Sequence, residues 1–339
     1  MFFKKVACFT DIHFGMKGNS RVHNDDCEAF IYWFIDQAKA HGCETCIFLG
    51  DWHHHRSATN VSTMNYTVSN MERLGAAFEK VYVIMGNHDL YYREKREINS
   101  MEYIRNIPNI HLVNEWIVED DVAIIPWIVE DEWKKVAKMK QKYVFGHFEL
   151  PYFKMNAMVE MPDVGGIQTD HFAGCEKVWS GHFHKRQVMK NVTYMGNAFP
   201  HNYADAWDDE RGMMVLEYGG EPKYINWPDM PRYRTIRISE LLNDPDKHLK
   251  PKMYVRVTLD IKISYEEANF IRETFIDKYD LRELQLIPEQ VEQAQQPTVE
   301  VQKFDSVDQI VIKQLQGVES ETYDKNILTA IYNDLDVNN

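Results

Sequence analysis

The chain has 339 residues, of which 44% are hydrophobic and 27% charged, and its formal net charge is −14. These values are ordinary for a soluble globular protein and leave room for one large domain and a smaller one. No apolar run reaches the roughly 18 residues that a membrane span needs, so a membrane protein is excluded and a cytoplasmic location is expected. The acidic charge argues against a chain that holds nucleic acid through a net basic surface. Any contact with DNA would need local patches, bound metal or a partner.

Residues 1 to about 200 are predicted to alternate between strands and helices. Short apolar runs rich in β-branched or aromatic residues fit strands covered on both faces. These runs are residues 5–10, 46–49, 81–85, 143–145 and 177–180. Helices are predicted at residues 25–40, 62–80, 94–106 and 131–141, the first with Asn24 or Asp25 as its N-cap. Shorter strands are predicted at residues 111–113, 116–118, 122–126, 187–189, 193–195 and 213–218.

A segment rich in Gly and Pro, residues 219–234, predicts a boundary after a first domain of residues 1–230. A strand at 253–263, a helix at 265–279 and a strand at 283–288 predict a small β-α-β domain over residues 235–289. Residues 290–305 are polar and are predicted to be a linker. Two short amphipathic helices within residues 306–339 are too small for a core of their own, so we expect them to dock on a partner.

Side chains that bind metals come directly after five of the predicted strands. The segments are Asp11-Ile12-His13, Gly50-Asp51, Gly86-Asn87-His88-Asp89, Gly146-His147 and Gly181-His182-Phe183-His184. Open α/β folds place their active sites at the carboxyl ends of the strands, which meet at one edge of a sheet. Any one segment has a plain alternative as a helix cap, a turn or a solvated loop. Five segments together, each after a strand, favour a functional site.

The ligand types indicate the kind of metal site. Asp, His and Asn without Cys suit hard or borderline divalent ions better than a structural zinc. The candidate ligands are more numerous than one ion needs, which predicts two ions about 3.5–4 Å apart that share a carboxylate. Asp51 is the natural bridge, because a carboxylate has two oxygens to divide between two ions.

The ordered motifs D-x-H, GD, GNH(D/E), GH and GHxH resemble those of the calcineurin-like metallophosphoesterases over about the first 200 residues. Within that superfamily the chain is most similar to the SbcD-type DNA repair and recombination nucleases, particularly those of tailed phages. The segments that carry this similarity are Phe9-Thr10-Asp11-Ile12-His13-Phe14-Gly15, Ser180-Gly181-His182-Phe183-His184-Lys185-Arg186-Gln187 and Met195-Gly196-Asn197-Ala198-Phe199-Pro200. The resemblance implies a two-sheet α/β sandwich, a small α+β domain that caps DNA, and a helical tail that docks on an SbcC/Rad-type coiled-coil ATPase.

The resemblance also implies roles for individual residues. One ion would be held by Asp11, His13, Asp51 and His184. The other would be held by Asp51, Asn87, His147 and His182. His88 would be the general acid or transition-state stabiliser, Asp89 would orient its ring, and His54 would contact phosphate. The loop Trp52-His53-His54-His55-Arg56 departs from the family pattern, which leaves open which of its three histidines faces the site.

The favoured hypothesis is a DNA exonuclease and endonuclease with two ions, expected to be Mn²⁺. It would hydrolyse phosphodiesters without a covalent enzyme intermediate, in an SbcCD-type recombination and double-strand-break repair complex. Its substrates would be duplex ends and single-strand regions, with 3′→5′ polarity implied by the family. The chain would act as a homodimer, with residues 62–80 and 94–106 forming a helical bundle. Its location would be the cytoplasm of the bacterial host if a phage encodes it.

Local features near the motifs bear on DNA as the substrate. Basic clusters occur at Arg93, Lys95 and Arg96 and at Lys185, Arg186 and Lys190. Trp52, Tyr91 and Tyr92 are available to stack on unpaired bases. Ordinary solvated faces and buried packing are the alternatives for these residues. Two other functions remain open: a phosphoesterase for small phosphodiesters or phosphoproteins, and a non-catalytic scaffold subunit of a repair complex. The complete ligand set argues against the scaffold.

Overall fold

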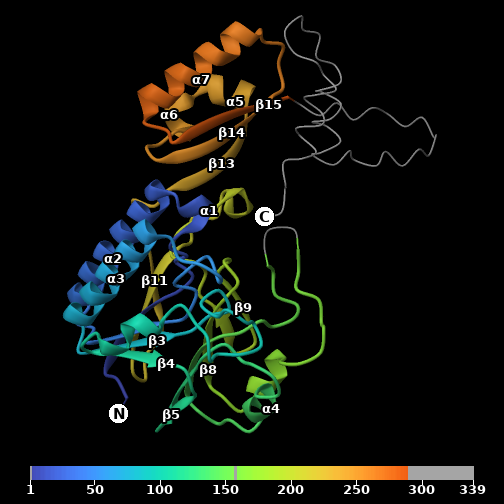
Figure 1. Ribbon diagram of the computed structural model, residues 1–339. Coiled ribbons are helices and arrows are strands. Elements are labelled where there is room, and N and C mark those ends of the chain that lie inside the picture. The colour runs from blue at the N-terminus through green and yellow to red at the C-terminus, as the bar shows by residue number, and fades with distance from the viewer. Residues whose placement is uncertain (1, 156–158, 289–339) are drawn as a thin grey trace, which may run out of the picture. The chain divides into compact units, whose positions relative to one another are not determined.

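The computed structural model describes residues 2–155 and 159–288, all within a unit that spans residues 1–289 (Figure 1). The predicted linker at 290–305 and the predicted helical pair at 306–339 lie outside the described residues. No helix in the described ranges combines the length and the apolar character that crossing a membrane requires.

The first sheet has the strand order β12-β11-β1-β2-β3-β4. Its strands are β1 (Lys5–Phe9), β2 (Thr45–Phe48), β3 (Lys80–Ile84), β4 (Ile110–Val113), β11 (Gly212–Glu217) and β12 (Lys223–Asn226). Strands β1 to β4 are parallel, whereas β11 runs antiparallel to β1 and β12 antiparallel to β11. The carboxyl ends of β1, β2 and β3 therefore lie at one edge of this sheet.

The second sheet has the strand order β5-β6-β7-β8-β10-β9. Its strands are β5 (Ile117–Glu119), β6 (Val122–Ile125), β7 (Tyr143–His147), β8 (Lys177–Gly181), β9 (Gln187–Met189) and β10 (Val192–Tyr194). Strands β6, β7, β8 and β10 are parallel, and β5 and β9 are antiparallel edges. The expected two-sheet α/β sandwich is confirmed.

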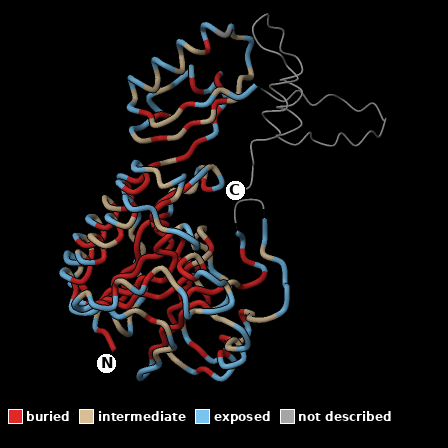
Figure 2. Tube along the Cα trace, viewed as in Figure 1, coloured by how far each residue is buried: buried red, intermediate tan, exposed pale blue. Residues whose placement is uncertain are grey.

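Alternation of side chains along the strands builds the layers. Val6 and Cys8 on β1 point into a core between the two sheets, where they join Phe145 and Trp179 from the second sheet. Phe9, on the other face of β1, packs in a second core under the helices. Burying both faces explains why these strands are apolar throughout. Figure 2 shows the buried residues concentrated along these strands.

Two long helices cover the outer face of the first sheet, α2 (Arg21–Ala40) and α3 (Val61–Ala77), which lie side by side (Figure 1). The predicted N-cap of α2 was wrong. Ser20 caps the helix and accepts the N–H of His23, while Asn24 lies inside the helix. The Asn24 side chain instead accepts the N–H of Gly15 at 2.9 Å, which ties α2 to the loop after β1. Asn60 caps α3 through the N–H of Ser62.

Other predicted elements are shorter in the structure or absent from it. The helix predicted at 94–106 is wrong for most of its length, because only the 3₁₀ turn η1 (Glu102–Asn106) is helical. Arg96 lies in the preceding loop, where its guanidinium bonds both carboxylate oxygens of Glu132 at 2.7 Å, a long-range ion pair that fixes an irregular backbone. The helix predicted at 131–141 is reduced to α4 (Trp133–Val136). The remaining short elements are α1 (Met16–Asn19), η2 (Thr169–Phe172) and η3 (Tyr203–Asp205).

A three-stranded parallel sheet follows, with the order β13-β14-β15. Its elements are β13 (Arg232–Arg237), α5 (Ile238–Asn243), α6 (Pro245–His248), β14 (Met253–Leu259), α7 (Tyr265–Tyr279) and β15 (Glu283–Pro288). The predicted β-α-β order of β14, α7 and β15 is found. Strands β12 and β13 were missed, because both lie at least partly in the segment whose Gly and Pro content indicated a boundary. The sheet has its own core, in which Val255 and Val257 are fully buried.

Candidate metal centre

The predicted ligands lie on loops at the carboxyl ends of strands from both sheets. Asp11 and His13 follow β1, and Asp51 follows β2. The backbone holds these two loops together, because the N–H of Asp11 donates to the carbonyl of Gly50 at 3.0 Å and that of His13 donates to the carbonyl of Asp51 at 3.1 Å. Asn87 follows β3, His147 ends β7, and His182 and His184 follow β8.

Close approach of the loops requires glycine at two positions. A Cβ atom on Gly86 would lie 2.2 Å from Oδ1 of Asp51, and one on Gly50 would lie 2.5 Å from Nδ1 of His147. The backbone is also strained where the ligands stand. Asp11, His13 and Asp51 have left-handed φ angles of 51°, 53° and 63°, a conformation that non-glycine residues rarely adopt outside functional sites.

The structure brings the first group of predicted ligands together. His13 Nε2 lies 3.8 Å from Asp11 Oδ1 and 3.7 Å from Asp51 Oδ2. His184 Nε2 lies 4.0 Å from the same Asp11 oxygen. Asp11 and Asp51 are buried carboxylates, and His13 is 1% exposed. These four side chains therefore face one small space.

The second group adjoins the first at Asp51. Oδ2 of Asp51, the oxygen nearest His13, lies 3.4 Å from Nε2 of His147. That Nε2 lies 3.3 Å from Oδ1 of Asn87. Ligand atoms of Asp51, His147 and His182 lie within 4.8 Å of one another, although Nε2 of His182 is 3.2 Å from a carboxylate oxygen of Glu149. Asp51 is thus the residue that both groups share.

These residues fit divalent ions. Neither ring nitrogen of His13 has a hydrogen-bond partner among the described residues, and buried polar atoms without a partner are uncommon in folded proteins. Nδ1 of His147 lies 2.6 Å from the carbonyl oxygen of Leu49, which directs Nε2 toward Asp51. A backbone acceptor on one ring nitrogen is a common way to orient a metal-binding histidine.

Burial and neighbouring charges shift the pKa values of the two groups of ligands differently. Burial lowers the pKa of His13 well below its usual value, so its ring is neutral at neutral pH and can offer a lone pair. Burial alone would also lower the pKa of His147, but the negative charge of Asp51 outweighs it and raises that pKa to about 9. Burial opposes ionisation of Asp51, yet His147 holds the pKa of Asp51 well below its usual value. The negative charge of Asp51 therefore favours a positive charge at this position.

His88 and His54 lie beside the first group. Ligand atoms of His13, His54 and His88 lie within 4.8 Å of one another, and the rings of His54 and His88 stack at 5.4 Å. Nδ1 of His88 lies 2.7 Å from the carbonyl oxygen of His54. Of the three consecutive histidines, His54 faces the site. His53 is buried with Nδ1 2.8 Å from the hydroxyl of Ser100, and His55 is exposed.

The contacts of Asp89 differ from those expected of a residue that orients the His88 ring. Its carboxylate instead accepts four backbone N–H groups, from Asp51 at 2.9 Å and from Trp52, His53 and Gly86 at 3.0 Å each. The carbonyl of His54 is the group that contacts the His88 ring. Asp89 thus fixes the loop that carries Asp51, and acts on the site through the backbone.

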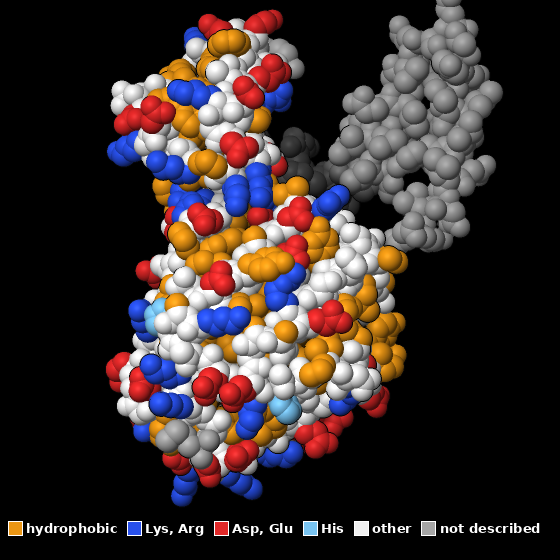
Figure 3. All heavy atoms as spheres, turned by 90° about the vertical axis from the view of Figure 1, so that its left-hand side faces the viewer, with side chains coloured by type: hydrophobic (Ala, Val, Ile, Leu, Met, Phe, Trp, Pro, Cys, Tyr) orange, Lys and Arg blue, Asp and Glu red, His pale blue; other side chains and the backbone are white. Residues whose placement is uncertain are grey.

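The other residues predicted to contact DNA differ in their exposure and in their ion pairs. Trp52 is fully buried against Phe14 and Phe48, so it cannot stack on a base. Tyr91 and Tyr92 are half exposed and pack edge to face. The basic clusters are largely paired with acids, as in the contacts Arg93–Glu149, Lys95–Glu97, Arg96–Glu132 and Lys190–Asp170. Figure 3 shows one face of the two-sheet part, on which basic and acidic side chains are interspersed.

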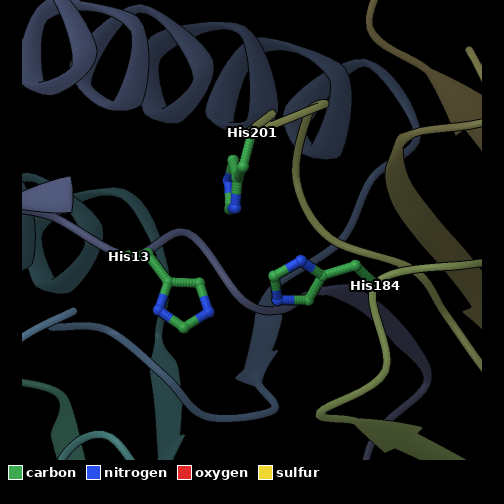
Figure 4. Close-up of side chains that lie close together, drawn as sticks. All are labelled: His13, His184 and His201. Carbon is green, nitrogen blue, oxygen red and sulfur yellow. The ribbon is translucent and has the colours of Figure 1, made fainter. Parts of the chain in front are cut away.

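Two residues at the site were missed from the sequence. Glu149 contacts His182, and His201 is fully buried beside His13 and His184 (Figure 4). Both follow quoted motifs closely. Glu149 is two residues after His147, and His201 comes directly after the segment that ends at Pro200. A search for further acids and histidines just beyond each strand-end motif would have found them.

A two-sheet α/β sandwich with Asp, His and Asn side chains gathered at its strand ends is the arrangement of a metal-binding α/β protein. Comparison with protein families identifies the family. The model described as Calcineurin-like phosphoesterase matches residues 4–225, and the chain belongs to this family. The expected family is therefore confirmed.

Similar proteins include a phage relative and two solved structures. The chain is 26% identical over 222 residues to "Exonuclease subunit 1" of Enterobacteria phage T4, a match that covers 63% of this chain and 64% of the relative, less than two thirds of its length. A crystal structure of the Pseudomonas putida nuclease MPE is 17% identical, with a TM-score of 0.32, and covers 63% of this chain and 84% of that one. A crystal structure of a dimetal phosphatase from Danio rerio is 10% identical, with a TM-score of 0.42, and the match covers 63% of this chain and 92% of that one.

Proposed function

We propose that the chain is the nuclease subunit of a DNA recombination and repair complex and hydrolyses phosphodiesters at a two-ion centre. The observation that carries this proposal is the position of Asp51, whose Oδ2 is within 3.7 Å of His13 and 3.4 Å of His147. One ion would be held by Asp11, His13, Asp51 and His184. The other would be held by Asp51, Asn87, His147 and His182.

Bound divalent ions would polarise the phosphoryl group and make a water molecule more acidic. The protein supplies the geometry and a proton. With the carbonyl of His54 2.7 Å from Nδ1 of His88, a proton is favoured on Nδ1, which leaves Nε2 to serve the substrate. The water would lose one proton to solvent, and its oxygen would bond to phosphorus while the bond to the sugar oxygen breaks. His88 in its protonated form would give the departing sugar oxygen a proton from Nε2. His54, stacked on His88, contacts the phosphate.

A basic pocket supports DNA as the substrate. The pocket has a volume of about 490 Å³, and Lys247, Lys250 and Lys252 line it together with Arg232 and Arg234. Asp209 pairs with both arginines. The three lysines form no ion pair within residues 2–155 and 159–288, so their charges are available to phosphates. Contacts of this kind bind the DNA backbone without reading its sequence.

The finer parts of the proposal rest on the family and on the phage relative. The relative is called a subunit, which supports a partner, and we propose that this partner is an SbcC/Rad-type coiled-coil ATPase bound by residues 306–339. We further propose Mn²⁺ as the ion, 3′→5′ polarity on duplex DNA, activity at duplex ends and on single-strand regions, and a homodimer. We propose a cytoplasmic location, which would be that of the bacterial host if a phage encodes the chain.

The test compares substrates and a catalytic variant. The full chain is incubated with Mn²⁺ and either linear duplex DNA, a cyclic nucleotide or a phosphoprotein, and product release is measured with and without EDTA. We expect Mn²⁺-dependent release of nucleotides from DNA, reduced by about 10²–10⁴-fold in His88→Ala, as for loss of a general acid. The matched control is His111→Ala, an exposed histidine on β4. Turnover of the cyclic nucleotide or the phosphoprotein without DNA cleavage would replace the nuclease with a phosphoesterase. Equal DNA cleavage by native protein and His88→Ala would contradict the role of His88.

A further inference from the structure

His201 lies against the candidate metal centre, outside every motif that supplied the predicted ligands. Its side chain is fully buried, and neither ring nitrogen has a hydrogen-bond partner among the described residues. Ligand atoms of His13, His184 and His201 lie within 4.8 Å of one another. Figure 4 shows the three rings pointing toward a common space. A buried imidazole with two unpaired nitrogens is destabilising unless something binds it, so its position calls for a ligand.

The loop that carries His201 is fixed to the segment that carries His184. The N–H of Met195 donates to the carbonyl of Ser180 at 3.1 Å, and that of Asn197 donates to the carbonyl of His184 at 3.0 Å. At the other end, the N–H of His201 donates to Oδ2 of Asp205 at 2.9 Å. His201 is therefore held at a defined position relative to His184.

Packing alone does not account for His201. Its ring contacts Phe199, with centroids 5.0 Å apart, and His23, with centroids 5.5 Å apart. These contacts explain the burial of the ring, but an apolar side chain would meet them equally well. His23 does not serve as its partner, because Nε2 of His23 lies 2.9 Å from the carbonyl oxygen of His13. One ring nitrogen of His201 lies within 4.8 Å of ligand nitrogens of His13 and His184.

We propose that His201 supplies a third imidazole to the ion that Asp11, His13, Asp51 and His184 would hold. This inference rests on the proposed two-ion centre. Nitrogen ligands favour Fe²⁺, Co²⁺, Ni²⁺ and Zn²⁺, whereas oxygen ligands favour Mg²⁺ and Mn²⁺. The ion position next to His201 is thus expected to select metals that prefer nitrogen ligands. The position at Asn87, His147 and His182 keeps its original ligand set, so the two ions differ in affinity.

The test follows metal binding directly. The full chain is stripped of metal and titrated with Co²⁺, and binding is followed by calorimetry and by visible absorption, which responds to nitrogen ligands. The native protein is expected to bind two Co²⁺. In His201→Leu, one of the two is expected to bind about 10- to 100-fold more weakly, as when a group that supports a metal is removed, with a changed spectrum. Affinity for Mg²⁺ is expected to change less.

Stability distinguishes a ligand from a packing residue. Without metal, His201→Leu should unfold at the same or a higher temperature than the native protein, because it removes unpaired polar atoms. With Co²⁺ it should unfold at a lower temperature. His201→Asn is measured in parallel, so that a folding defect in one variant does not decide the result. The matched control is His111→Leu, which makes the same change at an exposed histidine on β4 and should bind two Co²⁺ with the native spectrum.

Two results would overturn the inference, and they are distinguishable. If both His201 variants bind two Co²⁺ with native affinity and spectrum, His201 is not a ligand, and the two-ion centre still stands. If the native protein binds neither Co²⁺ nor Mn²⁺, the two-ion centre fails, and the role of His201 fails with it.

Discussion

Asp89 offers a sharp test of how the centre is held together. Its Oδ2 accepts the N–H groups of Asp51 and Gly86, and its Oδ1 accepts those of Trp52 and His53. In Asp89→Asn, an NH₂ group replaces one oxygen and faces two N–H donors that then have no acceptor. The site is fully buried, and each unsatisfied buried donor costs about 1–3 kcal/mol. The expected loss in the free energy of unfolding is therefore about 2–6 kcal/mol.

The assay is urea unfolding of metal-free protein, so that metal binding does not contribute. Asp260→Asn is the control, because Asp260 is a half-buried carboxylate that accepts one backbone N–H, from Ser239 at 3.0 Å, together with the hydroxyl of the same residue. We expect this control to lose less than about 1 kcal/mol. If Asp89→Asn unfolds at the native urea concentration yet loses catalysis, Asp89 acts on the chemistry alone, and its structural role is refuted.

Three further predictions concern DNA, pH and metal. Replacing Lys247, Lys250 and Lys252 by Gln should weaken binding of duplex DNA and reduce the slope of log affinity against log salt by up to about 2.7, at about 0.9 per phosphate contact. The control Lys134→Gln, whose lysine pairs with Asp131, should leave the slope unchanged. An unchanged slope in the triple variant would exclude the pocket as a DNA-binding site. Burial lowers the pKa of His53 to about 3, so its contribution to stability is fully present above about pH 6.5 and declines as the pH falls, by at most about 1.4 kcal/mol per pH unit. Comparison of metal-free native protein and His53→Asn at pH 7 and pH 5 checks this, and a native protein that loses no more stability than the variant would contradict it. Mn²⁺ at 100 times its dissociation constant should stabilise the native protein by about 2.7 kcal/mol, and thermal unfolding with and without EDTA measures the gain; no gain would argue against metal binding.

Much of the fold was predictable because burial of both sheet faces makes the strands apolar throughout. Phe9 and Val6 on β1 point to opposite cores, and both are buried. Prediction failed where long-range contacts set the backbone. The sequence around Arg96 predicts a helix, whereas the structure has a loop there that is bonded to Glu132, far along the chain. Strand β12 was missed because it lies in the segment rich in Gly and Pro, and its pairing with β11 is a long-range contact that this composition does not show.

The predicted ligands came from local motifs, and the structure brings them together. Local motifs could not predict contacts and burial that depend on distant segments of the chain. Four N–H groups converge on Asp89 from two loops, and the burial of Trp52 depends on Phe14 and Phe48. His201 lies near His13 in a loop that is bonded to the segment of His184, which its distance in the sequence from His13 does not reveal.

The central claim is a two-ion centre joined by Asp51. The most direct measurement is the number of Mn²⁺ ions bound per chain after equilibrium dialysis, for native protein, Asp51→Asn and the exposed control Asp163→Asn. The account predicts two ions for the native protein and for Asp163→Asn, and fewer than two for Asp51→Asn. Two tightly bound ions in Asp51→Asn, or none in the native protein, would contradict it.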